Sequence, residues 1–148
     1  MVCSNSWLVA EGTPTERITI KGLNDVAGYW GYINISSQMA GSKINYCDIS
    51  GGGGNTSYRG LFYMYSGAFN NARVELNNTT FSRSQRYGMF LDWYDASSKC
   101  LITTADSTTV TFGTGADGCV DGNIAQYVSP ILVGVHATLA DYLTATGQ

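Results

Sequence analysis

Short segments in which apolar and polar residues alternate recur along this chain. The segment at 31–35 reads GYINI; GLFYM follows 29 residues later at 60–64, and GMFL a further 28 residues on at 88–91. Alternation with a period of two is typical of β-strands, because successive side chains point to opposite faces. Self-similarity at a fixed spacing is typical of repeat architectures. The pattern therefore predicts three equivalent strands, each stacked one turn above the last.

A second repeated element lies between these strands. Residues 43–50 read KINYCDIS and align with ELNNTTFS at 75–82, an offset of 32 residues. Two apolar positions coincide in this alignment, Ile44 with Leu76 and Ile49 with Phe81. They predict a second inward-facing column. With one strand taken from each element, the repeat is expected to contain two strands per turn.

Two registers are open for the third copy of the first element. Alignment on Gly88 places Phe90 inward, whereas alignment on the apolar pattern places Met89 and Leu91 inward. We prefer the apolar alignment, because it keeps the Asp92 carboxylate out of the core. The inward residues of the three strands are then Ile33, Ile35, Phe62, Met64, Met89 and Leu91.

The ends of the chain are less regular. Residues 17–20 and 108–112 predict further strands, and 131–133 predict another one after Pro130. Residues 137–143 predict a short helix or cap.

Composition narrows the classes of function. Only 13% of the 148 residues are charged, 18 are glycine, and the formal net charge is −3, which suits an all-β or repeat architecture. The eight scattered Lys and Arg residues form no basic stripe, so nucleic acid is not an expected partner. No apolar run reaches the roughly 18 residues that span a bilayer, so we expect no membrane insertion. The first residues, MVCSNS, do not have the character of a signal peptide.

Cysteine and histidine usage argues against a metal site. The four cysteines show no CxxC spacing, and the chain has one histidine, so we expect neither a bound metal nor another cofactor. We favour buried free thiols, with a disulfide between Cys100 and Cys119 as the alternative.

Several segments carry a resemblance to a known family. They are GTPTERITI at 12–20, YWGYI at 29–33, INYCDISGG at 44–52, NTTFSRS at 78–84 and YGM at 87–89. They resemble the right-handed parallel β-helix repeat proteins of bacterial surfaces. The resemblance implies an all-β fold, a right-handed single-stranded parallel β-helix of about 4–5 turns. It further implies one domain at 1–148, with the repeats at 12–115 and an irregular or capping region at 116–148, and an extracellular or cell-surface location.

An open β-helix leaves unpaired backbone and apolar core at its ends unless something covers them. Self-association satisfies both, so we expect a homo-oligomer, either a dimer or a larger assembly.

The outward positions predict a candidate binding surface. Asn34, Tyr63 and Phe90 form one outward column, and Ser36, Tyr65 and Asp92 form the next. Sugar rings stack on such aromatic and polar strips, and exposed aromatic surface also marks contacts between subunits. The candidate ligand-binding residues are Tyr63, Tyr65, Asp92, Trp93 and Tyr94, with polysaccharide as a candidate ligand.

No pair of acidic residues at a separation suited to glycoside cleavage is evident, and we assign no catalytic residue. The preferred function is a non-catalytic interaction module that self-associates and could bind glycans. The alternative is a polysaccharide lyase or glycoside hydrolase of parallel β-helix type. A convergent cluster of acids with strongly shifted pKa values would favour the enzyme.

Overall fold

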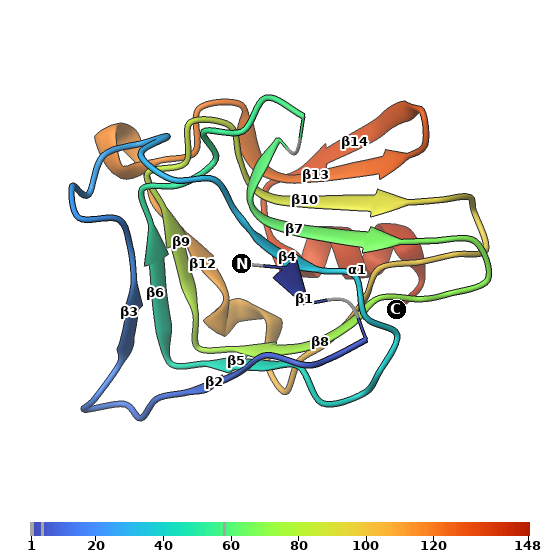
Figure 1. The fold of residues 1–148 in the computed structure, drawn as a ribbon, viewed down its shortest axis with the longest axis horizontal. Helices are drawn as coiled ribbons and strands as arrows, with labels where there is room; N and C mark the ends of the chain where they lie inside the picture. The colour runs from blue at the N-terminus through green and yellow to red at the C-terminus, as the bar shows by residue number, and fades with distance from the viewer. Residues whose placement is uncertain (1, 4, 58) are drawn as a thin grey trace.

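The computed structural model describes residues 2–3, 5–57 and 59–148, with side chains described from residue 5 onward apart from position 58. The chain winds into a parallel β-solenoid of about four turns with three walls (Figure 1). Seen from its N-terminal end, the backbone turns clockwise as it recedes, which is the right-handed sense. The predicted fold class is therefore confirmed.

Each wall is a sheet whose neighbouring strands come from successive turns. Sheet A contains β1 (Val2–Cys3), β4 (Ile33–Ile35), β7 (Gly60–Ser66), β10 (Tyr87–Trp93), β13 (Gly122–Val128) and β14 (Ile131–His136), in this order. Sheet B contains β2 (Val9–Glu11), β5 (Lys43–Asn45), β8 (Arg73–Asn77) and β11 (Leu101–Thr103). Sheet C contains β3 (Ile18–Ile20), β6 (Cys47–Ser50), β9 (Thr80–Ser82) and β12 (Thr111–Phe112). All pairings are parallel except that of β13 with β14.

The strand registers confirm the predicted inward columns. Ile33 lies opposite Phe62, and Phe62 lies opposite Met89, so the apolar alignment of the third copy is correct and the alignment on Gly88 is wrong. Ile44 pairs with Leu76 and Ile49 pairs with Phe81, as predicted. Fully buried side chains from all three sheets form one core. The solenoid is thus held together by apolar burial along its axis.

The prediction of two strands per turn is wrong, because each turn has three. The segment 43–50 is divided into β5 and β6 by Tyr46, whose φ is 51°, and β8 is separated from β9 by Asn78, whose φ is 46°. A left-handed residue turns the chain sharply between two extended segments. Asn78 also donates from Nδ2 to Asn45 Oδ1 at 3.0 Å, which ties the corner of one turn to the strand below. Ile44 and Ile49 therefore belong to two different walls.

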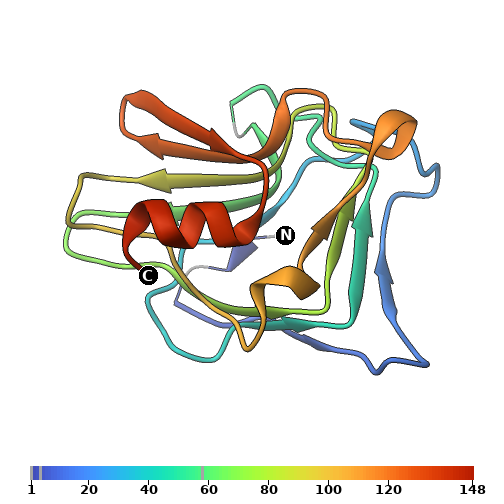
Figure 2. The same ribbon diagram turned by 180° about the vertical axis from the view of Figure 1, so that it is seen from behind.

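A short helix covers the C-terminal end of the solenoid (Figure 2). Helix α1 (Leu139–Thr146) begins at a capping box formed by Thr138 and Asp141. The buried Tyr142 hydroxyl accepts from Trp93 Nε1 at 3.1 Å and donates to Cys100 O at 2.8 Å. Beyond the helix, the Gln148 side chain accepts a hydrogen bond from the backbone N–H of Ile102 on β11, at 3.1 Å. The predicted cap is present, displaced a few residues toward the C-terminus.

Two other predictions are refined. The segment 108–112 is only partly a strand, because the 3₁₀ helix η1 (Ser107–Thr109) precedes β12; a second 3₁₀ helix, η2 (Gly115–Asp117), follows it. The predicted strand at 131–133 is longer, as β14, and returns antiparallel along β13.

The described cysteines are free thiols, so Cys100 and Cys119 form no disulfide. Burial raises the pKa of Cys100 to about 12 and that of Cys119 to about 11. In the described part of the chain, no helix is long and apolar enough to cross a membrane.

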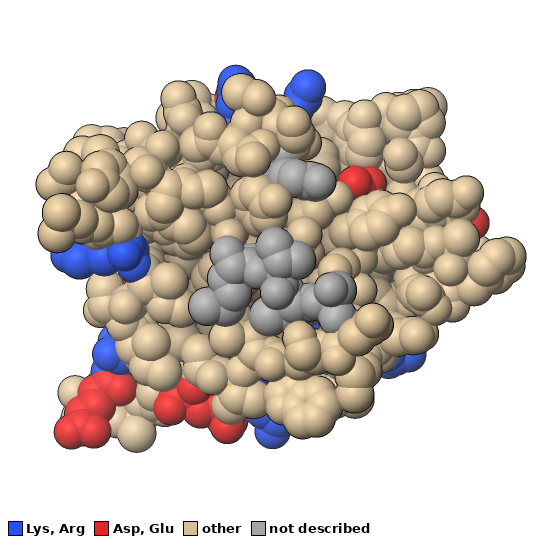
Figure 3. Space-filling view, in the orientation of Figure 1, with Lys and Arg blue, Asp and Glu red and all other residues tan. Residues whose placement is uncertain are grey.

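Charged side chains are sparse on the N-terminal end. In the face shown in Figure 3, the Lys and Arg side chains lie separately around the margin, without a continuous basic stripe.

Candidate functional site: the outer wall of sheet A

The outer face of sheet A carries two rows of side chains that run across successive turns. Strand register sets Asn34, Tyr63, Phe90 and Ala125 in one row, and Tyr65, Asp92 and Tyr127 in the next. Parallel pairing places each residue directly above its partner in the preceding turn. The seven residues are called the outer wall below. The sequence predicts these rows, and the structure adds β13 to them.

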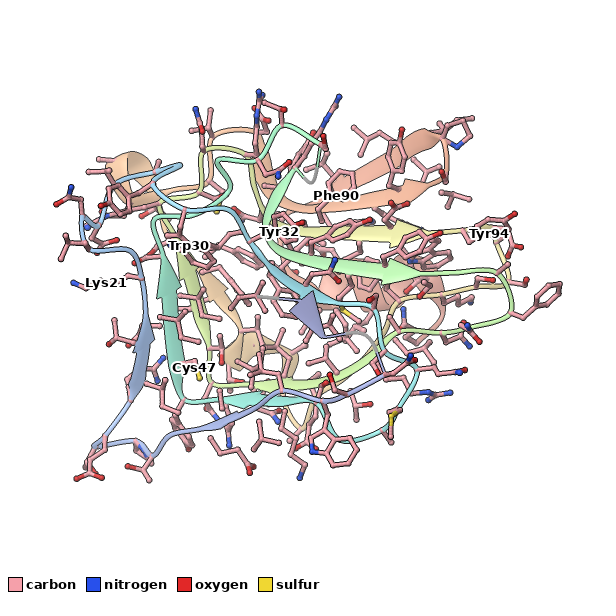
Figure 4. The ribbon with its side chains drawn as sticks, in the orientation of Figure 1. Lys21, Trp30, Tyr32, Cys47, Phe90 and Tyr94 are labelled. Carbon is pink, nitrogen blue, oxygen red and sulfur yellow. The ribbon has the colours of Figure 1, made fainter. Side chains whose placement is uncertain are left out.

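The rings of the outer wall pack against one another. Tyr63 and Phe90 have ring centroids 6.0 Å apart, and Phe90 and Tyr127 have centroids 5.4 Å apart. Tyr32, just before β4, meets Tyr63 edge-on at 6.0 Å. Figure 4 labels Tyr32 and Phe90, two residues of this aromatic group. These contacts form a second apolar cluster outside the solenoid core, in which Tyr63 is only 4% exposed. The wall is thus a packed aromatic surface and not a set of separate exposed rings.

Asp92 lies within this aromatic surface. The Tyr63 hydroxyl donates to Asp92 Oδ2 at 3.0 Å, while Asp92 Oδ1 is buried and has no hydrogen-bond partner among the described residues. Burial raises the pKa of Asp92, and the hydrogen bond from Tyr63 partly opposes that shift. None of the described Lys or Arg side chains forms an ion pair with it. A carboxylate in such a position costs free energy unless a donor reaches it.

A small pocket opens beside these residues. Its volume is about 270 Å³, and it is lined by Asn34, Ser36, Tyr63 and Tyr65. Asn34 is only 8% exposed, and its Oδ1 is buried without a hydrogen-bond partner among the described residues. The wall therefore contains two buried acceptors, Asn34 Oδ1 and Asp92 Oδ1, that have no donor among the described residues. Buried polar atoms in native proteins are nearly always hydrogen-bonded.

The structure separates the five predicted ligand-binding residues. Tyr63, Tyr65 and Asp92 lie together on the outer wall. Trp93 points inward, where its ring packs edge-on against Tyr142 in the core, so it is not available on the wall. Tyr94 is exposed in the loop after β10, at the end of sheet A and away from the labelled Phe90 (Figure 4). Asn34 and Ser36 line the pocket; the alternation pattern predicts their outward columns, but they are not among the five predicted ligand-binding residues.

The outer face of sheet C carries the densest group of charges. A groove of about 450 Å³ is lined by Asp25, Asp48, Arg83 and Asp117, together with several Ser and Thr residues. The Arg83 guanidinium bridges Asp25 at 2.8 Å and Asp117 at 2.6 Å. Arg17 holds Asp48 at 2.8 Å, and hydrogen bonding to this guanidinium lowers the pKa of Asp48.

These ion pairs bear on catalysis. Hydrolysis of a glycosidic bond uses two carboxyl groups, one of which is protonated and has a raised pKa. In the groove the Arg17 guanidinium favours the ionised form of Asp48, and Asp92 lies on a different wall. Among the described residues, no group of three or more His, Cys, Asp or Glu side chains could hold a metal ion.

The fold and the outer wall define a class, a short parallel β-solenoid with an aromatic external face. Comparison with protein-family models, curated protein sequences and solved structures gave no match.

Proposed function

We propose that this chain is a non-catalytic interaction module that self-associates through β14. The observation that carries the proposal is the edge position of β14 in sheet A, where no described strand pairs with its outer side. Its residues Ile131, Leu132, Val133 and Val135 are between 43% and 62% exposed. An uncharged edge strand of aliphatic residues is a template for pairing with another strand.

The sequence of β14 favours a second copy as the partner. The strand reads ILVGVH, with no Lys, Arg, Asp or Glu. A two-fold axis near the middle of β14, close to Val133, where the pairing of β14 with β13 shifts register, would bring two copies together antiparallel. Such a contact is isologous and closes after two copies. A charged partner strand would instead bury unpaired charge against aliphatic side chains.

The carboxylates support a binding role over the alternative glycoside hydrolase. Asp25, Asp48 and Asp117 are engaged by arginines, and Asp92 has no second carboxylate in its row. Neither arrangement supplies the acid and base pair that glycoside hydrolysis needs. An extracellular or cell-surface location belongs to the same proposal, since a self-associating β-helical module suits such a place.

Light scattering coupled to size-exclusion chromatography tests the proposal. The 15.9 kDa chain is expected to elute with twice its monomer mass, and Val133→Lys to elute as a monomer, because the lysine would face its own copy across the axis. Val120→Lys is the matched control, since Val120 is 73% exposed outside the strands. It should remain dimeric.

A wild-type chain that stays monomeric at high concentration would refute self-association. Dimers formed by wild type and by both variants would refute the assignment to β14.

A further inference from the structure

We propose that the pocket between Asn34 and Tyr65 binds one ring of a neutral glycan through its hydroxyl groups. The inference rests on the proposed function as a non-catalytic binding module, and it names the ligand class of the outer wall. It begins from the two buried oxygens, Asn34 Oδ1 and Asp92 Oδ1, that have no hydrogen-bond donor among the described residues.

The two acceptors indicate the chemistry of the ligand, because neither has a hydrogen-bond donor among the described residues. Both need donors, and both lie beside aromatic rings, Asn34 in the pocket lined by Tyr63 and Tyr65, and Asp92 in hydrogen-bond contact with the Tyr63 hydroxyl. A sugar ring combines hydroxyl donors at its edge with C–H groups on its face, so it can satisfy acceptors while it lies against an aromatic ring. A purely apolar ligand would leave both oxygens unsatisfied.

The size of the pocket limits how much of a ligand can lie within it. Its volume is about 270 Å³, just below the range of pockets that enclose drug-sized molecules. It therefore suits a single sugar ring, with the rest of the glycan chain outside.

Charge selects a neutral glycan. No described Lys or Arg pairs with Asp92, and the pocket is lined by uncharged residues. A uronic acid or a sulfated sugar would bring a second negative charge next to an uncompensated carboxylate, which is unfavourable in a site of low dielectric.

Access to Asn34 Oδ1 requires a side chain to move. The oxygen is sealed from solvent, whereas Tyr65, which lines the same pocket, is only half-buried. Rotation of the Tyr65 ring is the movement that would let a sugar hydroxyl reach Asn34 Oδ1, and it would leave the ring free to cover the bound sugar. Side-chain rotations of this kind are common on binding.

Isothermal titration calorimetry of the full chain tests the proposal. The probes are neutral hexasaccharides of glucose, mannose, galactose and xylose, with oligogalacturonate as the anionic counterpart. We expect at least one neutral probe to bind and the anionic probe not to bind. Asn34→Leu removes the acceptor at similar volume and should weaken binding at least about tenfold, and Tyr65→Ala should weaken it as well.

Asn70→Leu is the matched control, because Asn70 is exposed in the loop after β7; its affinity should equal that of wild type. Thermal unfolding establishes that each variant is folded, and Tyr65→Ala keeps the test decisive if Asn34→Leu does not fold. The proposal is overturned if no neutral probe binds at millimolar concentration, if folded Asn34→Leu and Tyr65→Ala bind as tightly as wild type, or if oligogalacturonate binds in place of the neutral probes.

The two proposals fail separately. Val133→Lys should lose self-association and still bind the neutral sugar, because β14 contributes no residue to the pocket. A monomeric wild type that binds sugar would refute only the association through β14.

Discussion

The hydroxyl of Tyr142 should be a major contributor to the stability of the capped end. It accepts from Trp93 Nε1 and donates to Cys100 O, and Tyr142 is completely buried. Tyr142→Phe keeps the ring in place and leaves one donor and one acceptor without this partner. Because each unsatisfied buried group costs about 1–3 kcal/mol, we expect a loss of about 2–4 kcal/mol in the free energy of unfolding. This is a large fraction of the roughly 5–15 kcal/mol typical of a domain.

Urea denaturation followed by tryptophan fluorescence, together with calorimetry, measures this loss. For a chain of this size the loss corresponds to a fall in Tm of roughly 5–15 °C. Tyr94→Phe is the matched control, since its side chain is exposed, and it should change stability by less than about 0.5 kcal/mol. A double-mutant cycle with Trp93→Phe isolates the bond between the two side chains. Equal stability of Tyr142→Phe and Tyr94→Phe would refute the reasoning.

Two further predictions concern the wall and a corner. Burial raises the pKa of Asp92, so the Asp92 carboxyl keeps its proton to a higher pH in the folded chain than in the unfolded chain. The free energy of unfolding therefore falls as the pH rises from the ordinary pKa of Asp through the raised pKa of Asp92. Asp92→Asn should therefore unfold at higher urea than wild type at neutral pH, with the advantage disappearing near pH 3; an unchanged or lower midpoint at pH 7 would contradict this. At the corner, Asn78→Val should lose about 2–3 kcal/mol, because a β-branched residue is strained at positive φ and the bond to Asn45 is lost. Asn78→Gly, which removes the same bond without that strain, should lose less, as measured by urea denaturation, and equal losses would argue against a left-handed corner.

The strand columns could be predicted from the sequence because alternation is a local property. Ile33, Phe62 and Met89 carry the same inward pattern at nearly constant spacing, and the requirement to keep Asp92 out of the core decided the register. The same alternation places Trp93 inward. That signal was available, and it would have removed Trp93 from the candidate site.

The corners and the pocket could not be predicted in the same way. Nothing in the residue type of Tyr46 indicates a left-handed φ, because tyrosine rarely adopts it, and the division of 43–50 into two walls depends on that one residue. Asn34 shares its pocket with Tyr63 and Tyr65, which come from the next turn of the solenoid. Hydrogen-bond satisfaction is a property of the assembled structure.

Helix α1 gives the solenoid a terminus that cannot template growth. It lies over the C-terminal end, and the Gln148 side chain occupies the backbone N–H of Ile102 on the outermost strand of sheet B. A second copy approaching head to tail would have to displace helix α1 and the Gln148 side chain before its strands could pair with this end of the solenoid. Head-to-tail elongation into a filament is thereby opposed at the C-terminal end of every molecule.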